Sequence, residues 1–404
     1  ANGKRLIVFV LVIFSIFFVL YYPNFQLIRK SVHFDPLNAK PGFGTLYGRN
    51  PESKEMSFML VGDWGMKSHM QDILAHQMEI NAEKYKTQFI LSNGDNIYSW
   101  GAGSVYDPRF YKIFESSYTL NPTFDKMPWY MALGNHDRRG NIAAQLQYAT
   151  YDTRWVMPQR FYTFYLPIFD HLSLPPVQVI VLDTLPLVCP DIENVPTQIA
   201  LQNIECESFL YSLMSREMAA NNGGTMTIDD YTVIHQIISR ERELQLKWLE
   251  KALSENETNG WKIVVGHHAF ESASTVHGPQ AALNQEVRPI LNKYNVDVYI
   301  CGHDHNLQHI SKVNDKIDHF VVGGGGFVTT SRSLHALFSS QEYPGIQFAK
   351  TTYGFAVASL SPTEMTMRFI DYYGKEIYKT IITKNGEPVV PNLKRWESQL
   401  TKPG

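Results

Sequence analysis

Five apolar runs of strand length each end in a glycine followed by Asp, Asn or His, and no other feature constrains the fold of this chain as strongly. Glycine lets the backbone turn sharply where a strand ends. In open α/β sheets, ligand sites form at the carboxyl ends of neighbouring strands, so the motifs predict one shared site. The five motifs are Gly62-Asp63-Trp64-Gly65, Gly94-Asp95-Asn96-Ile97-Tyr98, Gly134-Asn135-His136-Asp137, Gly266-His267-His268 and Gly302-His303-Asp304-His305.

The order of apolar and helical segments predicts an α/β fold with two sheets. Helical patterns at His69–Tyr85 and Ser239–Ser254 alternate with apolar runs, which is typical of sheets buried on both faces. After about residue 308 the strands follow one another without helices, which indicates a second, more antiparallel sheet. Helices outside two packed sheets would give a four-layer α/β/β/α sandwich. The expected strands are Met56–Val61, Gln88–Leu91, Trp129–Leu133, Val177–Leu182, Lys262–Val265 and Val296–Ile300, followed by His319–Val322, Gly354–Ser359, Glu364–Asp371 and Lys375–Ile382.

Composition divides the chain into a hydrophobic segment, a linker and one large domain. The expected boundaries are 1–22 for an N-terminal transmembrane helix, 23–54 for a linker rich in Pro and Gly, 55–385 for the main domain with an insertion at about 186–240, and 386–404 for a polar tail. Hydrophobic residues make up 44% of the chain, which is ample for a large core. The net charge of −3 shows no basic excess, so no nucleic-acid partner is expected.

The N-terminal segment predicts a membrane anchor. Leu6–Tyr22 runs for 17 residues without a charge, at the lower limit of the roughly 17–25 residues that span a bilayer. No small-residue cleavage site follows, which favours a signal anchor over a cleaved signal peptide. Lys4 and Arg5 lie closer to this segment than Arg29 and Lys30 on its other side, which slightly favours an N-terminus in the cytosol. We therefore expect a single-pass membrane protein with a lumenal or extracytosolic domain, and the sequon at Asn256 agrees with a glycoprotein.

The three cysteines are too few for a disulfide scaffold. Cys189 and Cys206 both lie in loop-like sequence and close a short loop, so they are the expected pair in an oxidising compartment. Cys301 ends an apolar run and is expected to be a buried free thiol.

The polar residues of the five motifs form a set suited to two metal ions. Two Asp, one Asn, one Tyr and three His supply mixed oxygen and nitrogen ligands, and a carboxylate can bridge two ions. Oxygen donors suit a hard trivalent cation, and imidazole suits zinc, iron or a similar divalent ion. Each motif alone has an ordinary explanation: Asp63 could cap a helix, Asp95 could occupy a turn, and His303 could be a common histidine. All five in order at strand ends favour a functional site.

Read in order, the motifs are GDWG, GDNIY, GNHD, GHH and GHDHNLQ. This series resembles the metallophosphoesterases, and specifically the purple acid phosphatases of the small tartrate-resistant type. Tyr98 in GDNIY is the discriminating residue, because the wider superfamily lacks a tyrosine ligand there. The stretch GFAVASLSPTEMTMRFIDYYGKEIYKT also resembles the last strands of that subfamily, and the likeness covers roughly residues 55–385.

The resemblance implies seven ligands for a pair of ions. A ferric ion would be held by Asp63, Tyr98 and His305, and a divalent iron, zinc or manganese ion by Asn135, His267 and His303, with Asp95 bridging the two.

The resemblance also implies roles for two further histidines. His136 would contact the substrate and donate a proton to the leaving group. His277 lies close to the position of a second active-site histidine of the family, at a slightly different spacing from His267.

On this interpretation the chain is an acid phosphatase that hydrolyses phosphate monoesters. The alternative is a membrane-anchored structural or interaction subunit that retains the fold, with a protein partner in a membrane assembly. A phosphodiesterase built on the same metal core is a third possibility. The complete set of ligands favours the enzyme.

Overall fold

This computed structural model describes residues 42–43, 55–119, 122–166, 176–189, 228–255, 260–311, 315–328 and 345–384. The expected transmembrane helix at 1–22, the sequon at Asn256, the tail at 386–404 and most of the linker and insertion lie outside the described residues. Among the described residues, no helix combines the length and the apolar character needed to cross a membrane. Cys189 is disulfide-bonded and Cys301 is a buried free thiol, as expected, whereas Cys206 lies outside the described residues.

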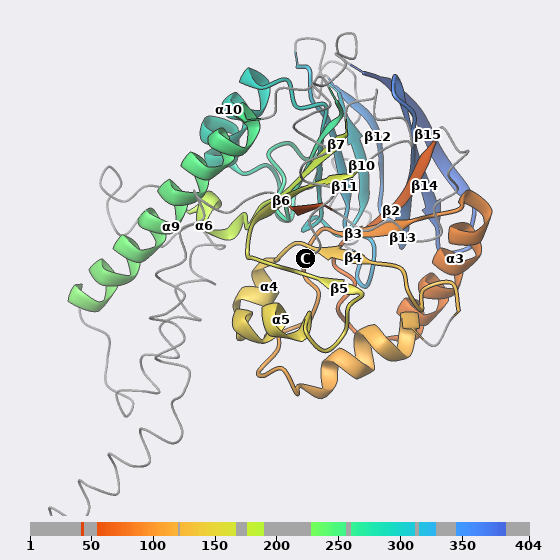
Figure 1. Cartoon of the computed structure of the whole chain (residues 1–404), viewed down its shortest axis with the longest axis horizontal. Helices are drawn as coiled ribbons and strands as arrows, with labels where there is room; N and C mark the ends of the chain where they lie inside the picture. Colours follow the sequence, from red (N-terminus) through yellow and green to blue (C-terminus); the bar gives the residue numbers. More distant parts are fainter. Residues whose placement is uncertain are drawn as a thin grey trace, which may run out of the picture. The chain divides into compact units, whose positions relative to one another are not determined.

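The described residues form two β-sheets of eight and seven strands (Figure 1). In spatial order, the eight-stranded sheet contains β1 (Gly42–Phe43), β6 (Tyr162–Leu166), β7 (Val177–Val181), β8 (Lys262–Val265), β9 (Val298–Cys301), β11 (Asp318–Val322), β10 (Leu307–Ile310) and β12 (Ile346–Lys350). The seven-stranded sheet contains β15 (Glu376–Thr383), β14 (Glu364–Asp371), β13 (Gly354–Leu360), β2 (Met56–Val61), β3 (Phe89–Ser92), β4 (Trp129–Met131) and β5 (Trp155–Val156). The α/β class with two sheets is confirmed.

The division of strands between the sheets differs from the expected one. The sequence suggested that all strands after about residue 308 form a separate sheet, but β10, β11 and β12 join the sheet of β7, β8 and β9. β11 pairs in parallel with β9, while β13 pairs antiparallel with β2. Local periodicity shows where a strand lies but not which distant strand it pairs with, because that choice depends on long-range contacts.

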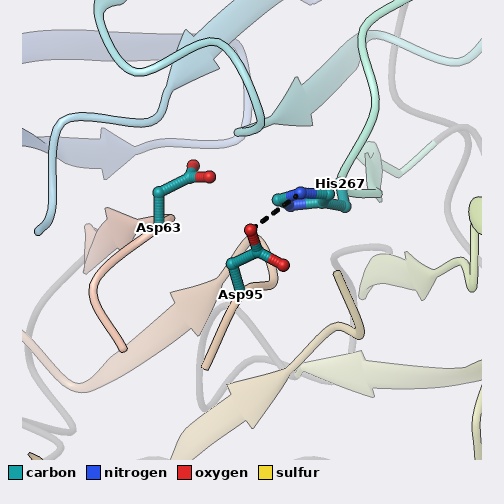
Figure 2. Close-up of side chains that lie close together, drawn as sticks. All are labelled: Asp63, Asp95 and His267. Atoms are coloured by element: carbon teal, nitrogen blue, oxygen red, sulfur yellow. Dashed lines mark ion pairs between the residues drawn. The ribbon is translucent and has the colours of Figure 1, made fainter. Parts of the chain in front are cut away.

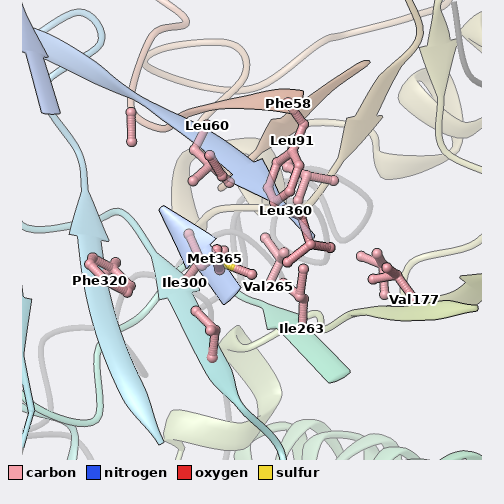
Figure 3. Close-up of a cluster of buried hydrophobic side chains, with 14 of the residues drawn as sticks. Phe58, Leu60, Leu91, Val177, Ile263, Val265, Ile300, Phe320, Leu360 and Met365 are labelled. Atoms are coloured by element: carbon pink, nitrogen blue, oxygen red, sulfur yellow. The ribbon is translucent and has the colours of Figure 1, made fainter. Parts of the chain in front are cut away.

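The main core lies between the facing sheets. Met56, Phe58 and Leu60 alternate along β2 and contribute to this core, while Met59 and Val61 point to the opposite face, as the two-residue period of a strand requires. The eight-stranded sheet contributes valines of β7 and β8, together with Ile300 and Phe320 (Figure 3).

Helices cover the outer faces of both sheets (Figure 1). A second core packs them on the seven-stranded sheet and includes side chains of α3 (His69–Tyr85), the π-helix η2 (Phe110–Thr119) and α5 (Ile142–Tyr148). On the other side, the amide of Gln178 in β7 donates a hydrogen bond to the carbonyl oxygen of Ala252 in α9 (3.0 Å). The remaining helices are α4 (Asn135–Arg138), α6 (Leu185–Val188), α9 (Ile228–Ser254), the π-helix η4 (Leu283–Val287) and α10 (Arg288–Lys293).

Two helices show how local sequence sets helix ends. The hydroxyl of Ser68 caps α3 by accepting the N–H of Gln71 (3.1 Å), and Lys86 ends the helix in the left-handed conformation with φ of 52°. The expected bounds of α3 match. The second expected helix, Ser239–Ser254, is longer in the structure, because α9 begins at Ile228 within the segment interpreted as an insertion.

Phe58→Ala should remove much of the stability of the domain. Phe58 is fully buried and its ring stacks on Phe89 with centroids 4.9 Å apart. We expect the free energy of unfolding to fall by about 3–5 kcal/mol, as for other large cavities, measured by urea denaturation. Ile381→Ala is the control, because Ile381 is exposed, and it should change stability by less than about 0.5 kcal/mol. Equal effects of the two variants would contradict the assigned core.

Candidate metal centre

The backbone turns sharply at three of the expected ligands. Asp63, Asp95 and His303 each follow a strand and have positive φ values of 59°, 54° and 67°. Residues other than glycine rarely adopt this left-handed conformation, and where they do the site is often functional. The turns direct all three side chains toward the space between the loops, as Figure 2 shows for Asp63 and Asp95.

Glycines allow these loops to approach each other closely. A Cβ atom on Gly134 would lie 2.1 Å from Oδ1 of Asp95, and one on Gly302 would lie 2.4 Å from Oδ2 of Asp63. Both contacts are shorter than any side chain tolerates. These glycines therefore leave room for the carboxylates of other motifs, in addition to allowing their own loops to turn.

One group of oxygen and nitrogen donors contains Asp63, Tyr98 and His305. The hydroxyl of Tyr98 lies 3.1 Å from Oδ1 of Asp63 and 3.3 Å from Nε2 of His305. Nε2 of His305 is 3.4 Å from the same carboxylate oxygen. Burial raises the pKa of Tyr98 well above its ordinary value, and the charges of Asp63 and Asp95 raise it further. Three atoms that could bind a metal ion, the Tyr98 hydroxyl oxygen, Oδ1 of Asp63 and Nε2 of His305, thus lie within 3.4 Å of one another.

A second group contains Asn135, His267 and Asp95. Nε2 of His267 lies 3.1 Å from Oδ1 of Asn135 and 3.5 Å from Oδ2 of Asp95 (Figure 2). The N–H of His303 donates to Asp63 (2.9 Å), and its ring centroid is 5.0 Å from that of His267. The imidazole of His303 therefore lies beside this second group.

Asp95 lies between the two groups. Ligand atoms of Asp63, Asp95 and His267 all fall within 4.8 Å of one another. Burial alone would raise the pKa of Asp95, but His267, His136, the Tyr98 hydroxyl and the His136 N–H together lower it to about 2. A carboxylate that stays ionised at this depth requires nearby positive charge, and the mixed oxygen and imidazole donors on both sides suit metal cations.

The orientation of His267 is set by its neighbours. Its Nδ1 lies 2.9 Å from the carbonyl oxygen of Asn93 and donates to it, which leaves Nε2 facing the site. The hydroxyl of Thr184 accepts the N–H groups of His267 and His268 (both 3.2 Å). His268 is fully buried, and its Nδ1 lies 2.7 Å from the same Thr184 hydroxyl. Thr184 thus contacts both histidines of this motif.

Asp137 joins two of the motif loops, a role that sequence reasoning missed. Its carboxylate accepts the N–H groups of Gly134 (2.9 Å), Asn96 (3.0 Å) and Ile97 (3.1 Å) and the amide of Gln145 (2.8 Å). Burial and the charge of Asp95 raise its pKa to about 7. The signal was available, because an acidic residue three positions after a helix cap often accepts the N–H of that cap.

His136 stands at the edge of the site, with 21% of its side chain exposed. Its backbone N–H donates to Oδ1 of Asp95 (2.9 Å). Nδ1 lies 2.8 Å from the carbonyl oxygen of Ser99 and donates a hydrogen bond to it. Nε2 therefore faces the site, where it lies 4.0 Å from Oδ2 of Asp95. Burial lowers the pKa of His136 despite the opposing effect of Asp95.

His277 also lies beside the expected ligands. Its ring centroid is 4.0 Å from that of His303 and 5.9 Å from that of His305. The loop that carries it is held by Asp304, whose carboxylate accepts the hydroxyl of Ser272 and the N–H of Gly278. Asp304 separates the two histidines of its motif, and sequence reasoning gave it no role.

The structure thus brings together all nine residues singled out from the sequence. His136 and His305 are partly exposed, whereas the carboxylates and His267 are buried. Phe327 stacks on His305 (5.4 Å) and meets the ring of Tyr98 edge-on (4.8 Å). The site therefore reaches solvent beside His136 and His305.

Comparison with known proteins gives a consistent result. The family model for calcineurin-like phosphoesterases matches residues 56–307. The chain is 29% identical to human tartrate-resistant acid phosphatase type 5, over 82% of this chain and 92% of the relative. It is 32% identical to purple acid phosphatase 4 of Arabidopsis thaliana, over 82% and 84% of the two chains. Among solved structures, GAP50, the anchor in the inner membrane complex of Plasmodium, superimposes with a TM-score of 0.61 at 21% identity, covering 86% of this chain and 95% of that one.

Gly134→Ala should abolish metal binding, because the added methyl group would occupy the place of the Asp95 carboxylate. Gly103→Ala is the matched control, since its nearest neighbour would be 3.5 Å away, an ordinary contact. We expect purified Gly134→Ala protein to lose most of its bound transition metal in elemental analysis, while Gly103→Ala keeps it. Full metal content in Gly134→Ala would contradict the packing described for Asp95.

Proposed function

This chain is a calcineurin-like phosphoesterase of the purple acid phosphatase type, and we propose that it hydrolyses phosphate monoesters at acid pH with a ferric ion and a divalent iron, zinc or manganese ion. The observation that carries this proposal is the position of Asp95 between two groups of donor atoms. Asp63, Tyr98 and His305 would hold the ferric ion. Asn135, His267 and His303 would hold the divalent ion, and Asp95 would be shared.

The donor chemistry supports this assignment. Carboxylate and phenol oxygens favour a hard trivalent ion, and the group with Asn135 and two imidazoles favours a divalent one. When bound, the two cations would neutralise charge on the phosphate and activate water for in-line attack on phosphorus. The pKa of His267 is raised, since Asp95 and Asp63 outweigh its burial, so a cation must displace a proton there.

His136 has the geometry of the proton donor to the leaving group. Ser99 holds Nδ1, so Nε2 faces the site from its open side. Burial lowers the pKa of His136, which makes its protonated form a stronger acid and suits it to give up a proton to a departing alkoxide. His277, which packs against His303, would contact the phosphate oxygens.

The function is tested with the purified protein, 4-nitrophenyl phosphate and glycerol 2-phosphate at acid pH. We expect both monoesters to be hydrolysed, iron to be present by elemental analysis, and chelation to remove activity together with a visible charge-transfer band from Tyr98. A colourless, iron-free protein with full activity would contradict the metal assignment. Faster hydrolysis of the diester bis(4-nitrophenyl) phosphate would contradict the monoester assignment.

His136→Ala should lower kcat by about 10²-fold or more, the usual contribution of general acid catalysis, while metal content stays unchanged. His76→Ala is the matched control, because His76 lies exposed on α3, and its kcat should equal that of the wild type. Wild-type kcat in His136→Ala would remove His136 from the mechanism.

A structural role at a membrane is the second candidate. It is supported by the 17 uncharged residues Leu6–Tyr22 and by the likeness to GAP50, which is an anchor in the inner membrane complex of Plasmodium. We infer that residues 1–22 anchor the chain with its catalytic domain on the lumenal or extracytosolic side, where Asn256 would be glycosylated and a protein partner could bind. The two roles are compatible.

Deleting residues 1–22 should release the protein from membranes. We expect the full chain to resist alkaline carbonate extraction, which removes proteins that do not span the membrane. Glycosidase treatment should reduce the size of the full chain but leave that of an Asn256→Gln variant unchanged. Extraction of the full chain by carbonate would contradict the anchor, and its protease sensitivity in sealed vesicles from the cytosolic side would contradict the orientation.

A further inference from the structure

The loop that carries His277 has an exposed tip. Its base is closed by a backbone hydrogen bond from the N–H of Gln280 to the carbonyl oxygen of Ala269 (2.8 Å), and we call residues 269–280 the His277 loop. Near the tip, 52% of the Val276 side chain is exposed. Since apolar burial stabilises a segment in proportion to the area removed from water, it does little to hold this tip. The position of His277 therefore depends on polar contacts.

Asp304 supplies the first of these contacts. It is fully buried, and its carboxylate accepts the hydroxyl of Ser272 and the N–H of Gly278 (3.4 Å). Gly278 directly follows His277 and has a φ of 70°, a conformation that glycine adopts without steric cost. A single carboxylate thus holds the chain both before and after His277.

The hydroxyl of Ser272 is the point where the polar contacts of the loop meet. It donates to Oδ2 of Asp304 and accepts hydrogen bonds from Nε2 of Gln308 and the N–H of Ser274 (both 3.0 Å). A hydroxyl group has one proton to donate and two lone pairs, so its full hydrogen-bonding capacity is used here. The hydroxyl of Ser274 in turn accepts the N–H of Val276 (3.2 Å), which extends the network to the loop tip.

Gln308 connects this network to the eight-stranded sheet. It is a fully buried residue of β10, which lies between β11 and β12. Its Oε1 accepts the N–H of Ala273 (2.8 Å), while Nε2 donates to Ser272 and to Oδ1 of Asn306 (2.7 Å). The His277 loop is therefore bonded to a strand that is itself held on both sides.

We propose that Ser272 is a positioning residue for phosphate binding, which acts by holding His277 where it can contact the phosphate oxygens. This inference rests on the proposed function, because His277 has that role only if phosphate binds at the metal pair. The two partners of Ser272 in the last motif, Asp304 and Gln308, alternate along the chain with residues that face the site. The segment that places the metal ligands thereby also places His277.

Binding of inorganic phosphate to the metal-loaded protein tests this inference without turnover. Calorimetric titration compares the wild type, Ser272→Ala, His277→Ala and the double variant. We expect His277→Ala to weaken binding about ten- to a hundredfold, the range for a lost hydrogen bond to a charged group, and Ser272→Ala about three- to tenfold, because His277 is displaced but still present. The double variant should bind phosphate like His277→Ala alone, since a residue that acts only through another has no effect once the other is removed.

Further measurements separate positioning from general damage. Metal content should equal that of the wild type in all four proteins, and Ser272→Ala should raise KM for 4-nitrophenyl phosphate more than it lowers kcat. Ser116→Ala is the matched control, because the Ser116 hydroxyl donates only within its own helix, to the carbonyl oxygen of Lys112 (2.8 Å), and it should bind phosphate like the wild type. If Ser272→Ala does not fold, Ser274→Ala replaces it in the same comparison.

The failures of the two proposals are distinguishable. Multiplied losses in the double variant, wild-type affinity in Ser272→Ala, or loss of metal from Ser272→Ala would each overturn the positioning role and leave the phosphatase assignment standing. Wild-type affinity in His277→Ala would remove His277 from the phosphate site, and the role of Ser272 with it. If the metal-loaded wild type binds no phosphate, the proposed function itself fails.

Discussion

The sharing of the Asp95 carboxylate among several loops is the interaction on which the rest of the site depends. One oxygen accepts the N–H of His136 (2.9 Å), and the other lies 3.5 Å from Nε2 of His267. These partners follow strands of different sheets, so the carboxylate can make both contacts only if the sheets keep their relative position. Because Asp95 is buried, its ionised carboxylate is stable only beside positive charge, so these contacts cannot be lost without a large cost in free energy.

An ion-pair network, buried at Arg138 and Asp183 and partly exposed at its other members, helps to hold the two sheets in that position. Arg138, one residue after Asp137, pairs with Asp183 at the end of β7 and with Glu241 of α9 (3.1 Å). Arg160 pairs with the same Glu241 (2.7 Å). Breaking one partner of such a network leaves a buried charge uncompensated, which strongly disfavours any displacement of the loops. The network and the core around Phe58 therefore both act to keep the two sheets in their relative position.

The ends of the strands and the helix at His69–Tyr85 could be predicted from the sequence, because both depend on local patterns of residues. Glycine before Asp63, Asp95 or His303 marked the strand ends, and the helix at His69–Tyr85 followed from its period. Pattern could not show that β11 pairs with β9 while β13 pairs with β2, because pairing is decided by distant residues. The position of Asp137 in its motif was enough to suggest its bond to Gly134, but not its bonds to Asn96 and Ile97 in another loop. The role of Asp304 could not be assigned either, because its hydrogen bonds cross between loops.

Diffraction from metal-loaded crystals, recorded on both sides of the iron absorption edge, tests the central claim most directly. Our account expects two separate peaks, one within ligand distance of the Tyr98 hydroxyl and Asp63, the other near Nε2 of His267 and Asn135, with Asp95 in contact with both. The peak beside Tyr98 should be iron. A single peak, or any peak from which Asp95 is remote, would contradict the assignment of a paired metal centre and the chemistry inferred from it.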